Sequence, residues 1–326
     1  MNEFSLIKKL SKTIKTDNSV VVGIGDDTAV LRYKKDRYLL LTTDMIVQGT
    51  HFLINKATPY QIGWKAMAVN LSDIAAMGGI PKWGVVSLGG PFHKNSHQSP
   101  VTSHQFESQR SKTKDKKQKT EDRRQKGEKF VWEIYRGMSR VGKKFGVQIV
   151  GGDTDKADQW TINIALLGEV EKKYLKLRSG AKVGDQVFVT GRLGGSIYGK
   201  HLTFTPRIKE ARYLVTHYSV SSMMDLSDGL ASDLRRIMEQ SGVGMLVSEE
   251  KIPLSRKATN IRNAFCDGED FELLFTLPRN SAERLKRENL NWIFPIGEVI
   301  PAGKGLQMKN RTGKIKPIQW KGFEHF

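Results

Sequence analysis

Cysteine and long hydrophobic runs are both scarce in this chain of 326 residues. Its one cysteine, Cys266, excludes an intramolecular disulfide and favours a reducing compartment, so we expect a cytoplasmic protein. No stretch approaches the roughly 18 consecutive apolar residues of a membrane-spanning helix, and we expect no membrane association. The first 15 residues predict a short amphipathic helix and lack the apolar centre of a signal peptide.

Common nucleotide-binding and nucleophile motifs are also missing. Without a G-x-G-x-x-G motif, the usual dinucleotide-binding turn is excluded. Gly194, Gly199 and Lys200 have the spacing of a phosphate-binding loop, but His201 follows where that loop carries Ser or Thr. We therefore interpret this stretch as a glycine-rich turn. No Ser/His/Asp or Cys/His arrangement is evident, and we expect Cys266 to be a small buried residue.

Positive charge is in excess, with a formal net charge of +19. This charge suits a phosphate-handling protein but identifies no partner. Residues 92–129 are rich in Lys, Gln, Ser and Thr and nearly free of aliphatic side chains, so they cannot bury enough apolar surface to offset the entropy of ordering. We expect a mobile insertion that becomes helical towards its end. A solvated loop explains it better than a basic arm for nucleic acid, and its three histidines lack neighbouring metal ligands.

The remaining sequence alternates between strand-like and helix-like patterns. Short apolar runs bounded by turn residues predict strands, and the longer segment 60–78, which ends at glycine, predicts a helix. After a polar linker near residue 172 the pattern resumes, with a helix over 228–242 and a strand over 271–277. We therefore expect an α/β chain of the α+β type with two domains, 1–172 and 173–326. The strands predicted before the linker cover 20–24, 29–33, 38–44, 147–153 and 160–170.

Aspartates recur where predicted strands end, and such acids can converge on one edge of a sheet. They are the pair Asp26 and Asp27, Asp44 after Thr42 and Thr43, Asp153 after two glycines, and Asp225 and Asp228 before a helix. Asp73 differs, because it lies within a predicted helix that is apolar nearly all round. A buried carboxylate is costly unless it is paired or binds a metal, and no Lys or Arg lies on its helix face.

Gathering these acids requires a counter-charge. Two carboxylates about 4 Å apart repel by about 4 kcal/mol at an effective dielectric near 20. Oxygen ligands without Cys or His indicate Mg²⁺ rather than Zn²⁺, and Mg²⁺ usually bridges carboxylates to substrate phosphates. Each acid alone also has an ordinary interpretation as a helix cap, turn former or salt-bridge partner, but the whole set favours a Mg²⁺–phosphate site.

Eight segments occur in a characteristic order: GIGDDTAVL, TTDMIVQGTHF, KAMAVNLSDIAAMGGIP, VGGDT, RSGAKVGD, MDLSDGLASDL, DGEDFELLF and GFEHF. Through them the chain resembles the thiamine-monophosphate kinase family, part of the aminoimidazole-ribonucleotide-synthetase-like superfamily of ATP-dependent enzymes. The resemblance covers nearly the whole chain apart from the insertion. It implies a homodimer in which the N-terminal sheets of two copies form a barrel, with ATP between the domains and a C-terminal α/β domain completing the site.

The resemblance also implies an activity and residue roles. The activity is Mg²⁺-dependent transfer of the γ-phosphoryl group of ATP to the phosphate of thiamine monophosphate, giving thiamine diphosphate and ADP. Because that phosphate is already ionised at neutral pH, we expect no nucleophilic or general-base side chain. The implied Mg²⁺ ligands, for several ions per site, are Asp27, Thr42, Thr43, Asp44, Asp73, Asp153, Asp225 and Asp228. The implied ATP contacts are Tyr135, Arg178 and Ser227, and those to thiamine monophosphate are His51, Glu269 and Phe323. Asp26 is expected to shape the turn or to lie behind the metal ligands.

Two alternatives remain open from the sequence. One is another member of the superfamily, acting in selenophosphate synthesis, purine-ring closure or hydrogenase maturation, although the terminal cysteines typical of two of these groups are missing here. The other is a non-catalytic polyanion-binding protein that uses residues 92–129. We expect ATP and thiamine monophosphate as partners and consider nucleic acid a poor fit.

Overall fold

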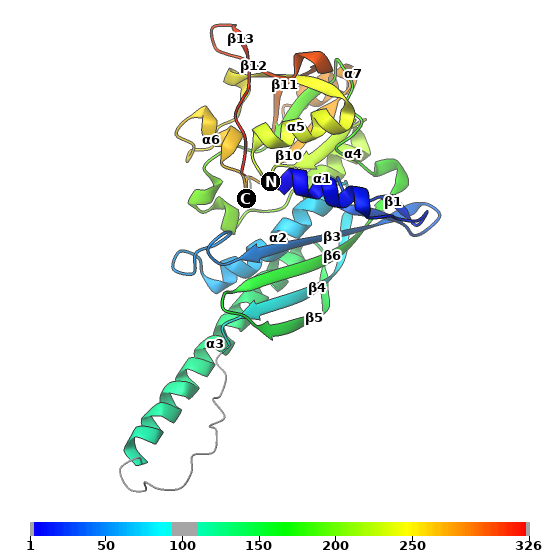
Figure 1. The fold of residues 1–326 in the computed structure, drawn as a ribbon. Helices are drawn as coiled ribbons and strands as arrows, with labels where there is room; N and C mark the ends of the chain where they lie inside the picture. Colours follow the sequence, from blue (N-terminus) through cyan, green and yellow to red (C-terminus); the bar gives the residue numbers. More distant parts are fainter. Residues whose placement is uncertain (1–2, 93–109, 324–326) are drawn as a thin grey trace.

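The computed structural model describes residues 3–92 and 110–323, which form two β-sheets with helices packed against them (Figure 1). This arrangement confirms the α/β class predicted from the sequence. No helix in these two ranges combines the length and apolar character needed to cross a membrane. The helices are α1 Glu3–Thr13, α2 Pro59–Ala76, α3 Arg110–Lys144, α4 Ile208–His217, α5 Leu230–Ser241, α6 Ile261–Cys266 and α7 Arg279–Arg287, and the 3₁₀ turns are η1 Lys172–Tyr174, η2 Ser196–Tyr198, η3 Lys200–Leu202, η4 Glu249–Lys251 and η5 Ala302–Lys304.

The N-terminal sheet has six strands in the order β1-β2-β3-β6-β4-β5. Only the β4–β5 pair is parallel. The strands are β1 Val20–Val22, β2 Ala29–Arg32, β3 Arg37–Val47, β4 Ile80–Gly90, β5 Gln148–Lys156 and β6 Thr161–Glu171. Because β2 pairs only with the first part of β3, the half of β3 from Thr42 onwards has a neighbour on one side alone within the described residues.

One face of this sheet is covered by α2, whose local sequence defines its start. The side chain of Thr58 accepts a hydrogen bond from the Gln61 amide (3.2 Å), and the Gln61 side chain accepts one from the Thr58 amide (2.9 Å). This capping box is followed by Pro59 at the first helical position. α2 is buried nearly all round because it contacts the N-terminal sheet, α3 and the C-terminal part of the chain.

Two glycines allow α2 and α3 to approach closely. A Cβ atom on Gly63 would lie 1.9 Å from the carbonyl oxygen of Ile134, and one on Gly137 would lie 2.0 Å from that of Tyr60. Either side chain would therefore push the helices apart. α3 begins at Arg110, so residues 110–129 of the insertion expected to be mobile are helical. The preceding part, residues 93–109, lies outside the described residues.

The opposite face of the N-terminal sheet carries apolar side chains and, in the described part of the chain, no helix covers it (Figure 1). Leu41, Met45, Val85 and Val150 are 37%, 55%, 38% and 58% exposed. Leu41 and Met45 point to the same side because side chains alternate along β3, whereas Leu40 and Ile46 are buried towards α2. We refer to this surface as the open face.

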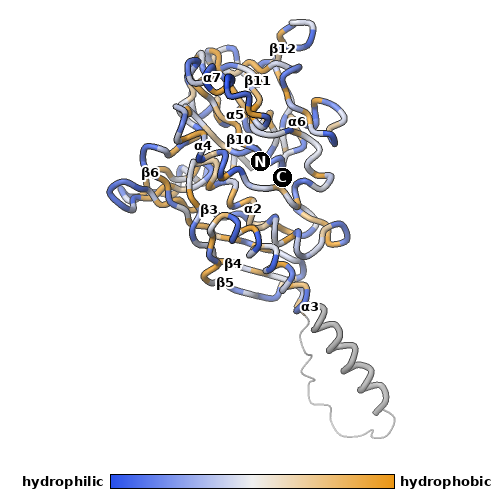
Figure 2. The backbone as a smooth tube through the Cα atoms, turned by 180° about the vertical axis from the view of Figure 1, so that it is seen from behind, coloured by the Kyte–Doolittle hydropathy of each residue, from blue (hydrophilic) through white to orange (hydrophobic). Residues whose placement is uncertain are grey.

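The C-terminal sheet has seven strands in the order β13-β12-β9-β11-β7-β10-β8, of which only β9 and β12 run parallel. The strands are β7 Gln186–Thr190, β8 Ser222–Asp225, β9 Val243–Ser248, β10 Leu273–Leu277, β11 Ile293–Pro301, β12 Leu306–Lys309 and β13 Ile315–Pro317. One core contains Phe188 and Phe275 from this sheet together with α4, α7 and α2, and a second contains α5 and α6. Hydrophobic stretches run along these elements, and the peripheral turns are mostly hydrophilic (Figure 2). Cys266, at the end of α6, is half-buried rather than fully buried as expected.

Candidate functional site

A cavity of about 800 Å³ lies where α2 and β3 meet the loops of the C-terminal part. It is lined by all but two of the residues to which the sequence assigned roles. These are Asp26, Asp27, Thr42, Thr43, Asp44, His51, Asp73, Arg178, Asp225, Ser227, Asp228, Glu269 and Phe323. Segments far apart in the sequence therefore meet at one place.

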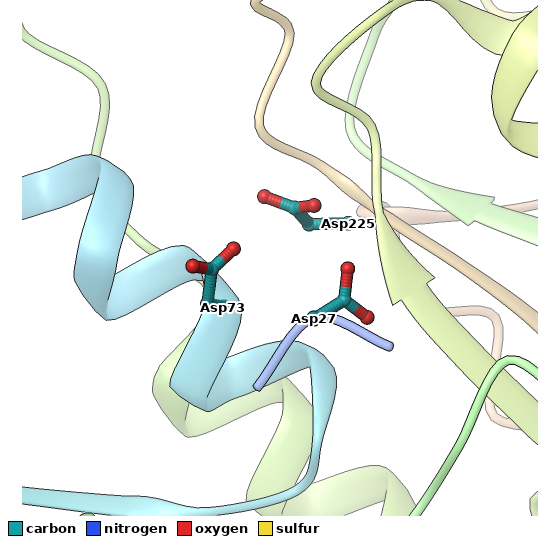
Figure 3. Close-up of side chains that lie close together, drawn as sticks. All are labelled: Asp27, Asp73 and Asp225. Atoms are coloured by element: carbon teal, nitrogen blue, oxygen red, sulfur yellow. The ribbon is translucent and has the colours of Figure 1, made fainter. Parts of the chain in front are cut away.

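Three carboxylates converge at one end of the cavity, from three separate elements. Asp27 comes from the loop between β1 and β2, Asp73 from α2 and Asp225 from the end of β8, and their side chains point towards one another (Figure 3). One oxygen from each lies within 4.8 Å of the others. This spacing is close enough for one cation to contact all three carboxylates.

Neighbouring hydroxyl and amide groups orient these acids. Thr42 donates to Oδ2 of Asp73 (2.5 Å), and Ser72 donates to Oδ2 of Asp225 (2.5 Å). The side-chain oxygen of Asn70 accepts a hydrogen bond from the backbone amide of Asp44 (3.0 Å), which fixes β3 against α2. The stretch 70–73 of α2 thus holds the two strands β3 and β8 in register at the site.

The environment raises the pKa values of several of these carboxyl groups. Burial, followed by repulsion from neighbouring aspartates, raises the pKa of Asp225 to about 7 and that of Asp44 to about 6. The same causes raise the pKa of Asp73 well above its usual range. Burial and Asp27 raise the pKa of Asp26 to about 7. The cluster is therefore short of positive charge.

These residues fit a divalent cation of the Mg²⁺ type. The donors are carboxylate and hydroxyl oxygens, which suit a hard cation. Oδ2 of Asp27 is buried and has no hydrogen-bond partner within the described residues, although buried polar atoms are normally paired. A cation at the cluster would satisfy this oxygen and offset the repulsion that raises the pKa values.

Two arginines supply part of the missing positive charge. Nη2 of Arg178 contacts Oδ1 of Asp27 (2.6 Å), and the backbone amide of Arg178 donates to Asp26 (3.1 Å). Arg236 pairs with Asp228 and, through Nη1, with Asp233 (2.8 Å). The sequence analysis did not identify Arg236, although its position eight residues after Asp228 in a predicted helix was a usable signal.

The other end of the cavity contains a residue that the sequence analysis also missed. Lys65 of α2 donates to the carbonyl oxygen of His51 (2.7 Å) and forms an ion pair with Glu269. His51 is itself oriented, since its Nδ1 accepts a hydrogen bond from the backbone amide of Val47 (3.0 Å). Lys65 lies four and eight residues before Val69 and Asp73, so the helical period places it on the same stripe, and the expectation that no Lys or Arg lies on the helix face of Asp73 is wrong.

The C-terminal segment crosses the start of α5 and brings Phe323 to the cavity. The amide of Phe323 donates to the carbonyl oxygen of Asp228 (2.9 Å), and the amide of Gly322 donates to the hydroxyl of Ser232 (3.0 Å). A Cβ atom on Gly322 would lie 2.0 Å from the Asp228 carbonyl oxygen, so only glycine fits here. Phe323 is thereby fixed to the loop that carries Ser227 and Asp228.

Asp153 and Tyr135 are the two predicted site residues that do not line this cavity. Asp153 is exposed on β5, at the edge of the sheet opposite to β1. Tyr135 is half-buried on α3, where burial raises its pKa, and it packs against the core. A single copy of the chain does not bring either side chain to the carboxylates.

The raised pKa values predict how the stability of the metal-free protein depends on pH. Because Asp26, Asp44 and Asp225 bind protons more tightly when folded, the native state holds more protons than the unfolded state between about pH 4 and pH 7. The free energy of unfolding in EDTA is therefore expected to fall as the pH rises through this window. Urea titrations at several pH values measure this slope, which should flatten in millimolar MgCl₂ and be shallower in Asp225→Asn. An equal slope with and without MgCl₂ would contradict the assignment.

Comparison with known families assigns both parts of the chain. Residues 25–109 and 114–170 match the family described as AIR synthase related protein, N-terminal domain, and residues 181–309 match its C-terminal domain. The thiamine-monophosphate kinase of Buchnera aphidicola subsp. Acyrthosiphon pisum is 32% identical over 99% of this chain and 98% of its own length. The thiamine-monophosphate kinase of Bacillus subtilis is 32% identical over the whole of both chains.

Solved structures agree with these sequence matches. A structure described as AaThiL complexed with AMPPCP and TMP has a TM-score of 0.76 at 30% identity and covers 100% of this chain and 97% of its own. The hydrogenase maturation protein HypE of E. coli covers 98% of each chain with a TM-score of 0.64, but its 17% identity shows a shared fold alone. The chain is 30% to 32% identical to these thiamine-monophosphate kinases and to the solved structure with AMPPCP and TMP over its whole length. The chain therefore belongs to the thiamine-monophosphate kinase family.

Proposed function

We propose that this protein is a cytoplasmic kinase of thiamine biosynthesis that transfers the γ-phosphoryl group of ATP to the phosphate of thiamine monophosphate. The observation that carries the proposal is the convergence of Asp27, Asp73 and Asp225 at one end of a cavity whose other end holds Glu269 and Phe271. A site with an acidic cluster at one end and an aromatic, carboxylate-bearing end suits a substrate with a phosphate and a cationic ring system. The similarity to thiamine-monophosphate kinases over the whole chain supports the same reaction.

The proposed Mg²⁺ ligands in one chain are the acids and one hydroxyl of the cluster. They are Asp27, Thr42, Asp44, Asp73, Asp225 and Asp228. The side chain of Thr43 points to the other side of β3, where its hydroxyl donates to Oδ1 of Asn163 (2.9 Å), so it is left out of this set. When bound, Mg²⁺ neutralises the phosphates and lowers the repulsion between two anionic reactants. Oriented carboxylates on a rigid helix and two strands fix where the phosphates lie, which supplies much of the catalytic effect through positioning.

The chain's own cations complete the phosphate site. Arg178 and Arg236 neutralise Asp27 and Asp228 in this structure, and both side chains line the cavity. We propose that they contact the phosphates of ATP once cations occupy the carboxylates. Ser227 lies between Asp225 and Asp228 in the sequence, and it also lines the cavity. No residue needs to remove a proton, because the attacking phosphate oxygen is already ionised.

We also propose that the active enzyme is a homodimer joined through the open face. Two edges of the N-terminal sheet, β5 and the half of β3 from Thr42 onwards, lack a second neighbouring strand within the described residues. If β5 of one copy pairs with this half of β3 in the other, the two sheets close into a barrel and cover the open face. Asp153 of one copy would then lie beside this half of β3 in the other, which accounts for its distance from the cavity in a single chain. The ATP contact proposed for Tyr135 needs the second copy for the same reason.

A direct assay tests the proposed function. Purified protein is incubated with ATP, thiamine monophosphate and millimolar MgCl₂, and thiamine diphosphate is quantified by chromatography. We expect one thiamine diphosphate per ADP formed, and no product in EDTA or when thiamine replaces its monophosphate. ATP hydrolysis without thiamine diphosphate would contradict the proposal and favour another activity of the same fold.

A further inference from the structure

A fully buried lysine lines the cavity and has no part in the proposed phosphate chemistry. Lys65 is 0% exposed, yet its ammonium group is a charge that is costly to remove from water. Its partners are the carbonyl oxygen of His51 (2.7 Å) and the carboxylate of Glu269. The lysine therefore joins a loop of the N-terminal part to a loop of the C-terminal part inside the ligand site.

The position of Lys65 on α2 sets its distance from the carboxylate cluster. Lys65, Val69 and Asp73 follow one another at four-residue intervals, and all three line the cavity. Eight residues of α-helix span about 12 Å, so Lys65 marks the end of the cavity farthest from Asp73 along this stripe. A ligand whose phosphate lies at the cluster would place its other end beside Lys65 and Glu269.

The backbone around Glu269 is held in an uncommon conformation. Glu269 and Phe271 have φ angles of 55° and 48°, in the left-handed region that residues other than glycine seldom adopt. The amide of Glu269 donates to the carbonyl oxygen of Ser227 (2.6 Å), and the side chain of Asp270 turns away to accept from the amide of Gly194 (2.8 Å). This tight path brings Glu269 and Phe271 to the cavity and turns Asp270 away from it, and strain of this kind is typical of ligand sites.

Lys65 fixes one oxygen of the Glu269 carboxylate and leaves the other available. Oε1 is the oxygen paired with Lys65, whereas Oε2 has no hydrogen-bond partner within the described residues. The Glu269 side chain is 27% exposed at the cavity. Phe271, stacked on Phe204 with ring centroids 4.3 Å apart, and Phe323 also line this cavity. An oriented carboxylate oxygen near aromatic rings is suited to a flat heterocycle that carries an amino group.

We propose that Lys65 is a positioning residue that orients Glu269 to accept a hydrogen bond from the amino group of the substrate's aminopyrimidine ring, and that this pair determines which ring is accepted. The inference rests on the proposed function, because it names the group recognised at the end of the cavity away from the phosphate. Without Lys65 the carboxylate loses its fixed partner and can rotate or bind water. Selectivity for an amino group over an oxo group should then fall, because an oxo group offers no hydrogen to Glu269.

Steady-state kinetics with two substrates test this proposal. Thiamine monophosphate is compared with its analogue in which an oxo group replaces the pyrimidine amino group. The wild-type protein is expected to prefer the amino compound by about 100-fold or more in kcat/KM, and Lys65→Met should reduce this preference to below about tenfold. The KM for thiamine monophosphate should rise about tenfold or more, while the KM for ATP stays within about threefold. The matched control Lys56→Met, an exposed lysine before α2, should leave both ratios unchanged.

A double-mutant cycle separates positioning from general damage. If Lys65 acts through Glu269, the double variant Lys65→Met/Glu269→Gln should be no more impaired than Glu269→Gln alone. If Lys65→Met does not fold, the double variant can still be compared with Glu269→Gln. The double variant leaves no unpaired buried charge, because it removes both members of the ion pair. Unchanged selectivity in Lys65→Met, or additive losses in the double variant, would overturn the inference while leaving the kinase activity established. A wild-type protein that makes no thiamine diphosphate would overturn the proposed function and this inference together.

Discussion

Replacing Asp73 with asparagine is expected to abolish turnover and, at the same time, to stabilise the metal-free fold. Asp73 is the member of the carboxylate cluster that lies within a helix, and its pKa is raised by burial and by Asp44, Asp225 and Asp27. Asparagine keeps the shape and the acceptor for the Thr42 hydroxyl but removes one repelling charge. Loss of this ligand should lower kcat by about 1,000-fold or more, because it weakens the binding of the cation that offsets phosphate charge.

Both effects can be measured on the same preparations. Thiamine diphosphate formation at saturating MgCl₂ reports turnover, and thermal unfolding in EDTA reports stability. We expect a midpoint a few degrees higher than in the wild type, with a smaller further increase on adding MgCl₂. The exposed Asp36, changed to Asn, is the matched control and should alter neither quantity. Turnover within tenfold of the wild type would exclude Asp73 from the metal site.

Replacing Val85 with lysine, in the middle of the open face, is expected to convert the protein to a monomer, because a charge placed in a buried interface is costly. We expect turnover to fall by about 100-fold or more. Val85 is suited to this test because it lies on β4, is 38% exposed and does not line the cavity. The loss of turnover follows if Asp153 and Tyr135 act on the site of the other copy. Ile315→Lys, at a side chain that is 48% exposed on β13, is the matched control.

Light scattering and activity measured over a range of protein concentrations test this second prediction. Val85→Lys should be monomeric at concentrations where the wild type and Ile315→Lys are dimeric, and its activity should recover in part as the concentration rises. A fully active monomer would contradict the contribution of the second copy. A dimeric Val85→Lys protein would exclude the open face as the interface.

Local sequence patterns were sufficient to predict the helix and the strand that build the site, α2 and β3. The helix predicted over 60–78 is α2, Pro59–Ala76, because the capping residues and the glycines that follow determine its ends. The strand predicted over 38–44 extends to Val47, because its ladder with β6 continues beyond the apolar run. The insertion is more helical than expected because Lys, Arg, Glu and Gln are good helix formers, and they continue a helix already packed against α2.

Contacts between distant segments were harder to predict. The acids share a sequence context, at strand ends, so their convergence could be inferred without knowing the fold in detail. The partners of Lys65 could not, since Glu269 is 204 positions away and has a backbone conformation that no local pattern indicates. Asp153 shares the context of the other acids, yet β5 lies at the edge of the sheet away from β1. The shared context of the acids therefore did not distinguish Asp153, which lies away from the cavity, from the acids that line it.

The stripe of α2 that lines the cavity also sets the length of ligand that the cavity accepts. Each end of the cavity joins one residue of this helix to one residue of the C-terminal part: Lys65 pairs with Glu269, and Asp73 lies beside Asp225. Because one helix carries both of the first residues and packs with α4, Phe188 and Phe275 in a single core, the spacing between the two ends is fixed by the helix itself. Two turns of α2 therefore act as a ruler for the ligand, and a helix of the same sequence with one residue inserted between Lys65 and Asp73 would no longer present both ends to the same molecule.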